Sequence, residues 1–295
     1  MFHHLMVPLD GSELAERALP IAEQIAKANC ATIDLVRVVR LPDAHMTLGG
    51  AAFLPQDACN TVLAGDVRSA SDYLDAQCQR LASNGVAGQT ATLTEHGHHV
   101  ASALLTYIRD NGVDMVVMCT HGRSGLARFT SGSVAERLLR HGTAPILLVH
   151  ASSAPISLEH LLVPLDGSLE HEDALPVAAS LAPIVHDVSL IRVIRIEAER
   201  VEAQQYLTSI AQRLAEQGIV VGECHVVLGD PTTEIKSVTH GGQLVVLATR
   251  AGGQLTGWAS RSVAERLDHD QAATMMLVRT GTTGRLPLSH DAPLS

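Results

Sequence analysis

The chain contains two copies of one sequence pattern, and this internal repeat limits its fold more than any other feature. The segment Val7-Pro8-Leu9-Asp10-Gly11-Ser12 returns 156 residues later as Val163-Pro164-Leu165-Asp166-Gly167-Ser168. Near the end of each copy, Ser133-Val134-Ala135-Glu136-Arg137-Leu138 returns as residues 262–267. A repeat of this length is too long for a solenoid unit and is typical of a whole domain.

The second match occurs at an offset shorter by 27 residues, so the first copy carries about that many extra residues. Most of the excess falls in residues 41–64, which are rich in Gly, Pro and Ala and which we interpret as an inserted loop. We therefore predict two homologous domains in tandem, residues 1–150 and 151–295, joined around residues 151–158, with a flexible C-terminal tail.

Each copy alternates short apolar runs with segments of helical periodicity. Leu14, Ala18, Ile21 and Ile25 have helical spacing, and Pro20 falls inside that pattern, where it should kink or loosen the helix. Strands separated by helices form parallel βαβ units, so the predicted fold class is α/β: two tandem doubly wound, Rossmann-like domains, each a mostly parallel five-stranded sheet with helices on both faces. The first domain is predicted to have strands at 5–8, 31–39, 87–95, 114–119 and 145–150, and helices at 13–28, 66–84, 100–111 and 133–141.

Composition argues against several classes of protein. The formal net charge is -10 with only two lysines, whereas nucleic-acid binding needs a basic face. No apolar run is long enough to span a membrane, the first residues lack the pattern of a signal peptide, and the five cysteines form no CxxC pair. We expect a cytoplasmic protein with no nucleic-acid or membrane partner.

Ligands of open α/β sheets bind beyond the carboxyl ends of the strands. In the first copy this edge holds Asp10 after the first strand, Val38 near the predicted end of the second, and the segment from Met118 after the fourth. A carboxylate such as Asp10 can accept hydrogen bonds from ribose hydroxyls, or it can form an Asx turn or cap the following helix. The sequence leaves both interpretations open.

A second candidate feature is Gly132-Ser133 at the start of a predicted helix. Free N–H groups and a partial positive charge make a helix N-terminus attractive to phosphate, and glycine allows close approach. The other interpretation is that Gly122 and Gly132 are turn glycines and Ser133 only a cap. The chain has no P-loop and no G-x-G-x-x-G after its first strand.

Together these residues resemble the universal stress protein family in its tandem two-domain form. Nucleotide-binding members of that family carry the pattern G-x2-G-x9-G-[ST]. Gly122, Gly132 and Ser133 match this pattern, and Cys119 stands in the place of its first glycine. The similarity extends over residues 5–150 and 161–279.

The resemblance implies that the first domain binds ATP, ADP or AMP, with magnesium compatible with the phosphates. It implies that Asp10 meets the ribose and that the backbone of Val38 meets the adenine. The predicted nucleotide-binding residues are Pro8, Leu9, Asp10, Val38, Met118, Thr120, His121, Gly122, Arg123, Gly132, Ser133 and Val134.

The second copy departs from this pattern. Its three glycine positions hold Ala248, Ala251 and Arg261, although Asp166 and Val193 remain. Arg261 would obstruct the phosphate position, so we predict that this half binds no ATP.

Other candidate residues have weaker signals. His96, His98 and His99 lie close together, but their spacing is that of turn residues and not of a metal site. We predict no metal ligand and no catalytic residue, and any ATP hydrolysis should be slow because no Walker lysine or general base is evident.

The resemblance thus predicts a nucleotide-linked regulatory protein of the stress response. Two alternatives stay open: a nucleotide-independent interaction or chaperone-like scaffold, in which Cys119 has spoiled the first site, and a slow ATPase. We also predict that the final strands, residues 145–149 and 274–279, pair and make the two domains an intramolecular pseudo-dimer, with a homodimer of chains as a further expectation.

Overall fold

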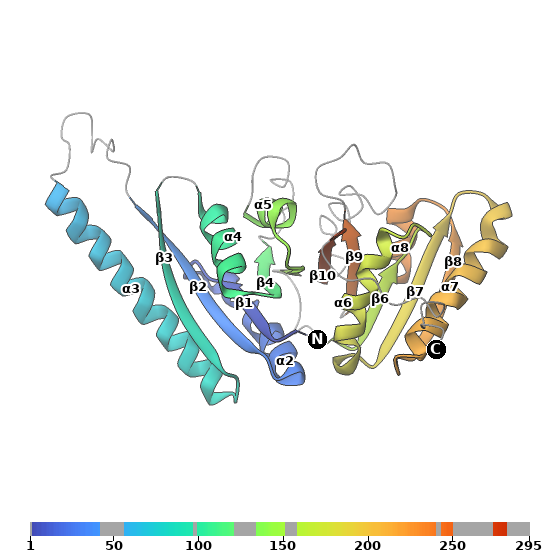
Figure 1. Ribbon diagram of the computed structural model, residues 1–295, viewed down its shortest axis with the longest axis horizontal. Helices are drawn as coiled ribbons and strands as arrows, with labels where there is room; N and C mark the ends of the chain where they lie inside the picture. Colours follow the sequence, from blue (N-terminus) through green and yellow to red (C-terminus); the bar gives the residue numbers. More distant parts are fainter. Residues whose placement is uncertain are drawn as a thin grey trace, which may run out of the picture. The chain divides into compact units, whose positions relative to one another are not determined.

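The computed structural model of the protein describes residues 2–41, 56–96, 99–120, 134–150, 158–239, 243–249 and 274–281. The chain divides into two compact units, an N-terminal unit of residues 2–118 and a C-terminal unit of residues 119–295 (Figure 1). The predicted α/β class, with tandem Rossmann-like sheets covered by helices, is confirmed. The repeat boundary at residue 150 stays a prediction.

The N-terminal unit is built on a parallel sheet with the strand order β3-β2-β1-β4. The central strand β1 is buried on both faces, with Leu5, Met6 and Val7 fully inaccessible. Such continuous burial is expected of a parallel strand between two helical layers. The strands are β1 His4–Pro8, β2 Thr32–Leu41, β3 Gly88–His96 and β4 Met115–Thr120.

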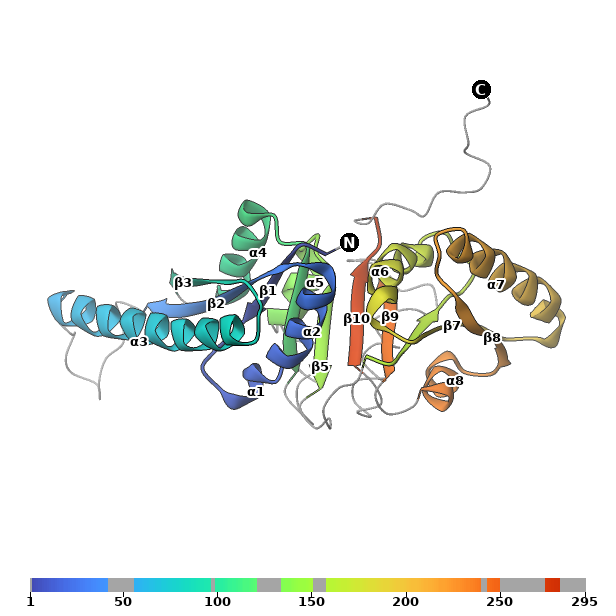
Figure 2. The same ribbon diagram turned by 90° about the horizontal axis from the view of Figure 1, so that it is seen from below.

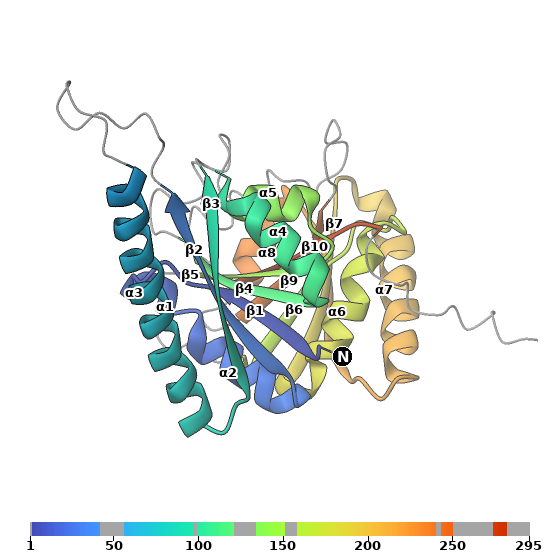
Figure 3. The same ribbon diagram turned by 60° about the vertical axis from the view of Figure 1, so that its left-hand side comes forward.

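Helices cover both faces of this sheet. The helices α2 and α3 pack on one face of β1, β2 and β3, and α4 packs on the opposite face (Figures 2 and 3). The helices of this unit are α1 Glu13–Glu16, α2 Leu19–Asn29, α3 Gln56–Ser83 and α4 Val100–Asn111. The prediction for α4 is confirmed residue for residue, because its apolar stripe faces the core.

The predicted kinked helix over residues 13–28 is wrong. The structure has two helices there, the short α1 and then α2. Ser12 begins α1 by accepting a hydrogen bond from the N–H of Ala15 at its Oγ (3.1 Å). Pro20 lies in the first turn of α2, where its missing N–H has no intrahelical partner to lose. Proline therefore starts a helix here and does not kink one.

The prediction of an inserted loop over residues 41–64 is also partly wrong. The helix α3 begins at Gln56, ten residues before the predicted start. Residues 42–55 lie outside the described part of the chain. The strand β2 runs to Leu41 and pairs with β3 from Ile33 opposite Gly88 to Leu41 opposite His96.

The C-terminal unit is built on a sheet with the order β5-β10-β9-β6-β7-β8, parallel except for β5. Figure 2 shows α6 and α7 on one face of this sheet and α8 on the other. The strands are β5 Ile146–His150, β6 His160–Pro164, β7 Asp187–Ile194, β8 Val221–Leu228, β9 Gln243–Thr249 and β10 Thr274–Arg279. The helices are α5 Val134–His141, α6 Ala174–Leu181, α7 Arg200–Ala215 and α8 Pro231–Val238, with 3-10 helices η2 His171–Asp173, η3 Ala182–Ile184 and η4 Glu197–Glu199.

The predicted pairing of the two final strands is observed. β5 and β10 run antiparallel, with Leu148 opposite Met275 and Leu147 opposite Met276. These four side chains are buried. An apolar strand left unpaired at a sheet edge is prone to aggregation, and this pairing satisfies both strands.

One set of long-range contacts occurs in both copies of the repeat. In the first copy, the guanidinium of Arg37 lies over the ring of Tyr73, 5.3 Å from its centroid. The Tyr73 hydroxyl donates to Glu16 Oε1 (2.9 Å), and Arg80 Nη1 lies 3.9 Å from Glu16 Oε2. The contacts tie β2, α1 and α3 together.

The second copy has the same contacts in a more buried form. Arg192 lies over Tyr206 at 5.3 Å, and the Tyr206 hydroxyl donates to Glu172 Oε1 (3.3 Å). Arg213 Nη1 donates to Glu172 Oε2 at 2.8 Å, and these two side chains are only 11% and 7% exposed. Burial and the charge and hydrogen bond of Glu172 raise the pKa of Tyr206.

These matched contacts predict unequal costs of mutation. Glu172→Ala removes a buried carboxylate that is bonded to both Arg213 and Tyr206, so we expect the free energy of unfolding to fall by about 3–5 kcal/mol. Glu16→Ala removes an exposed pair and one hydrogen bond, for which we expect about 1 kcal/mol. Urea denaturation of both variants measures the difference, and equal losses would contradict this account of the contacts.

Candidate functional site

The turn after β1 is the best-defined part of the predicted site. The Ser12 N–H and Oγ both donate to Asp10 Oδ1, at 2.9 and 2.6 Å, so Asp10 forms an Asx turn. Its side chain is exposed at the carboxyl edge of the sheet. The turn interpretation of Asp10 is therefore confirmed, and it leaves the carboxylate at the edge where a ligand of this fold class binds.

Glycine is needed at the centre of this turn. Gly11 has a φ of +89°, which L side chains rarely adopt. A Cβ atom there would also lie 3.1 Å from Arg37 Nη1. The guanidinium of Arg37, held over Tyr73, thus lies directly against the backbone of the turn.

Val38 lies inside β2 and not near its end, because the strand continues to Leu41. Its partner in β3 is Leu93, whereas β1 ends two residues earlier, with Pro8 opposite Val36. The C=O of Val36 points toward β1, since it accepts from the N–H of Leu9 (2.8 Å). Backbone groups of alternate strand residues point the same way, so those of Val38 point to the β1 side, beyond the end of β1.

The other predicted residues divide into two groups. Pro8 and Met118 are half-buried near the ends of β1 and β4, Leu9 is buried, Thr120 ends β4 and Val134 opens α5. The remainder lie outside the described part of the chain: His121, Gly122, Arg123, Gly132 and Ser133. The predicted phosphate-binding segment accordingly stays a prediction.

The second copy has the same turn but a different partner for its aspartate. The Ser168 N–H donates to Asp166 Oδ1 (2.8 Å), and Gly167 has a φ of +87°. His171 Nδ1 lies 2.6 Å from Asp166 Oδ1 and 3.0 Å from Ser168 Oγ. The side chains of His171 and Asp166 are 5% and 12% exposed.

Sequence reasoning missed the role of His171. The repeat places Ala15 at the equivalent position of the first copy, and that difference was the signal that could have found it. Burial alone would raise the pKa of Asp166. The hydrogen bonds from His171 and Ser168, together with the charge of His171, outweigh that effect and hold the pKa at about 2.

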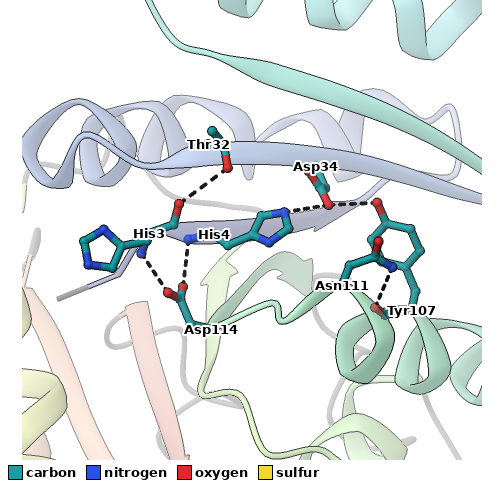
Figure 4. Close-up of polar contacts among 7 residues, drawn as sticks. All are labelled: His3, His4, Thr32, Asp34, Tyr107, Asn111 and Asp114. Carbon is teal, nitrogen blue, oxygen red and sulfur yellow. Dashed lines mark hydrogen bonds and ion pairs between the residues drawn. The ribbon is translucent and has the colours of Figure 1, made fainter.

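A further polar cluster that the sequence did not predict lies near the amino ends of β1 and β2 (Figure 4). The carboxylate of Asp34 is 2% exposed, and its Oδ2 accepts from the Tyr107 hydroxyl (2.7 Å) and lies 2.7 Å from His4 Nε2. Asp114 accepts from the N–H groups of His3 and His4 at 2.7 and 3.1 Å. These contacts fix the start of β1, at the opposite end of the strand from Asp10.

Of the three histidines considered as metal ligands, two lie in the described part of the chain. His96 ends β3, His99 is exposed just before α4, and His98 lies outside the described residues. Within the described ranges, no three His, Cys, Asp or Glu side chains are grouped so as to hold a metal ion. In the same part of the chain, no helix combines the length and apolar character needed to cross a bilayer.

The fold and the turn after β1 define a tandem Rossmann-like α/β protein with an acidic side chain at the carboxyl edge of its first sheet. The sequence model of the universal stress protein family matches residues 1–150. The chain belongs to the universal stress protein family.

Individual relatives agree with this assignment. Universal stress protein YxiE of Bacillus subtilis is 28% identical over 152 residues, which cover 50% of this chain and 99% of that protein. A universal stress protein structure from Archaeoglobus fulgidus is 17% identical, covers 94% of this chain and 98% of its own, and superposes with a TM-score of 0.70, which shows the fold alone. A universal stress protein solved in complex with cAMP is 22% identical, covers 51% of this chain and 98% of its own, and reaches a TM-score of only 0.37, too low to support a structural argument.

The contact between Asp166 and His171 predicts a specific pH dependence. A carboxylate whose pKa is lowered on folding stabilises the folded state above its unfolded pKa, and that contribution is lost as pH falls through the folded pKa. The Asp166→Asn variant lacks this stabilising contribution at every pH. The difference in free energy of unfolding between wild type and this variant should be largest near neutral pH and shrink between about pH 4 and about pH 2. Urea denaturation at several pH values measures it, and a difference that stays constant over this window would contradict the lowered pKa.

Proposed function

We propose that the first copy of the repeat binds an adenine nucleotide, ATP or its products ADP and AMP, and that occupancy regulates the chain in a stress response. The observation that carries the proposal is the Asp10 turn. This turn presents the Asp10 carboxylate at the carboxyl end of β1. The neighbouring strand β2 continues beyond that end, and there the backbone groups of Val38 point to the β1 side.

Each part of a nucleotide has a chemically suitable partner. A carboxylate offers about four acceptor positions, so the Asp10 side chain can serve the turn and the ribose hydroxyls together. The N–H and C=O of Val38 form a donor and acceptor pair of the kind that an adenine edge requires. Ribose is therefore assigned to the end of β1, and adenine to the part of β2 around Val38 that extends past that end.

The phosphates are assigned to the segment before α5. The supporting features are the sequence Gly122, Gly132-Ser133 and the start of an eight-residue helix at Val134, whose N-terminus favours anions. Magnesium is compatible with phosphates held in this way. This part of the proposal rests on the sequence pattern.

The tandem arrangement extends the proposal. We assign the two copies to residues 1–150 and 151–295, in a cytoplasmic protein, with β5 and β10 pairing them as a pseudo-dimer within one chain. Association of two chains is a further expectation. Regulation then consists of nucleotide occupancy that stabilises one arrangement of the tandem.

A second candidate is a scaffold that works without nucleotide. The observation that favours it is Cys119, which replaces the first glycine of the family's phosphate pattern. A slow ATPase is the third candidate, and product formation in excess of enzyme would favour it. Nucleotide binding without turnover would favour the first candidate, a nucleotide-binding regulatory protein.

Matched aspartate variants test the ribose assignment. Asp10→Ala should weaken ATP affinity by about 1.5–3 kcal/mol, the scale of hydrogen bonds to a charged group. Asp166→Ala should leave affinity nearly unchanged, although it removes the buried partner of His171. Calorimetric titration of the full chain measures both, with ADP, AMP and cAMP as comparison ligands. Equal losses would mean that both copies bind nucleotide or that they are coupled.

A second variant tests the phosphate assignment. Gly132→Arg introduces the side chain that the second copy carries as Arg261, where backbone must approach phosphate. We expect ATP binding to be lost while helix content and the urea midpoint stay near wild type, and we expect Gly132→Ala to be milder. Tight ATP binding by folded Gly132→Arg would remove this helix N-terminus from the proposed site.

A further inference from the structure

Most of the strongly exposed large apolar side chains in the described part of the chain lie at one end of the second copy. They belong to the segments that follow β6 and β7 or that end β8, at the carboxyl edge of the sheet: Leu169, Ile196, Val201 and Leu228. We call these four side chains the apolar patch. Single exposed apolar residues are common, whereas several gathered at one edge indicate a surface that binds a partner.

Short contacts connect the segments that carry the patch. Leu169 lies two residues after Gly167, and the guanidinium of Arg192 packs against that glycine. Arg192 Nη2 also lies 3.5 Å from Glu202 Oε1, and Glu202 follows Val201 at the start of α7. The segments of Leu169 and Val201 are therefore joined through one guanidinium.

The other half of the patch is built on the β7–β8 ladder, and the first copy has no equivalent of most of it. Leu228 lies opposite Ile194 at the end of β7, and Ile196 follows two residues later. In the first copy, the positions that correspond to Leu169, Val201 and Leu228 hold polar residues. By the repeat and the matching ladders, these are Glu13, Arg68 and Thr94. The fold itself thus does not require an apolar surface here.

The chain leaves β10 at this same edge. β10 is parallel to β9, and β9 is parallel to β6, so the carboxyl ends of all three lie together. The N–H of Thr280 donates to the C=O of Thr249 (2.9 Å), and the N–H of Gly281 donates to Asp173 Oδ2 (2.5 Å). Asp173 is buried at the end of η2, four residues after Leu169. The end of β10 is therefore anchored beside the patch.

Residues 282–295 follow this anchor and lie outside the described part of the chain. Their sequence contains Leu286-Pro287-Leu288 and Ala292-Pro293-Leu294. Proline disfavours helix at itself and at the residue before it, so both triplets favour extended backbone. Leucines two positions apart point to the same side of an extended chain.

The distance from the anchor to the patch suits this segment. In the order β10-β9-β6-β7-β8, four strand spacings of about 4.8 Å separate β10 from β8, or about 19 Å. The seven residues from Gly281 to Leu288 span about 22 Å at about 3.1 Å per extended residue. The leucines on either side of Pro287 can therefore reach the ends of β7 and β8.

We propose that residues 282–295 dock on the apolar patch of their own chain, with Leu286 and Leu288 against Ile196, Val201 and Leu228. The anchor at Gly281 holds the segment within reach, which gives the same chain a large advantage in effective concentration over a second copy. Open α/β sheets bind ligands at this edge, so the second copy holds a proline-containing segment of its own chain where a ligand would otherwise bind. The proposal does not depend on nucleotide binding by the first copy.

Photo-crosslinking of the full chain tests the docking directly. With p-benzoylphenylalanine in place of Leu288, irradiation should give crosslinks within one chain to residues 194–202 or 226–229, mapped by mass spectrometry. The yield should not change when the protein is diluted tenfold, because the contact is intramolecular. Crosslinks to other segments, crosslinks between chains alone, or no crosslinks would overturn the proposal.

Matched serine variants test whether the patch is the cause. Ile196→Ser and Val201→Ser should each lower the crosslink yield by about threefold or more, since each removes apolar area from the contact. Val220→Ser is the control, because Val220 is more exposed than Ile196 (81% against 57%) but precedes β8 at its other end. Circular dichroism confirms folding of each variant. Equal yields from folded Ile196→Ser, Val201→Ser and Val220→Ser would overturn the proposal.

Discussion

A tight turn with a positive-φ glycine directs the chain from the first strand of each copy into the following helix. Asp10 and Asp166 close this turn by accepting the N–H of the serine two residues on. An arginine stacked on a tyrosine lies against the glycine, and a glutamate from the next helix holds the tyrosine hydroxyl. The edge at which these folds bind ligands is therefore built by side chains from three separate segments of each copy.

The retention of these contacts in both copies separates structural from ligand-binding roles. The second copy has lost all three phosphate glycines but keeps Gly167, Arg192 and Tyr206. The features common to both copies serve the fold in each of them, and in the first copy Asp10 is proposed to contact ribose as well. The glycine pattern distinguishes the copies, and it is the reason for assigning the nucleotide to the first copy.

Local sequence pattern predicted much of the fold and less of the site. Hydrophobic periodicity located α4 residue for residue and every strand of the first copy to within two residues at each end, because burial of one face controls both. It failed at Pro20, where a proline permitted in a first turn was taken as a kink, and at the start of α3, where Gly and Ala suggested a loop. The contacts of Tyr73 and Asp34 were missed because they join segments far apart in the sequence, and no local pattern records such contacts. The contact of His171 with Asp166 spans only five residues, and the signal for it is the difference between His171 and Ala15 of the first copy.

The central claim is that one chain holds one adenine nucleotide, in its first copy. Native mass spectrometry of the full chain, titrated with ATP against a non-binding control protein, tests it most directly. The account predicts a single ATP adduct per chain that saturates and is not followed by a second specific adduct. A folded chain with no specific adduct, or with two of them, would contradict it.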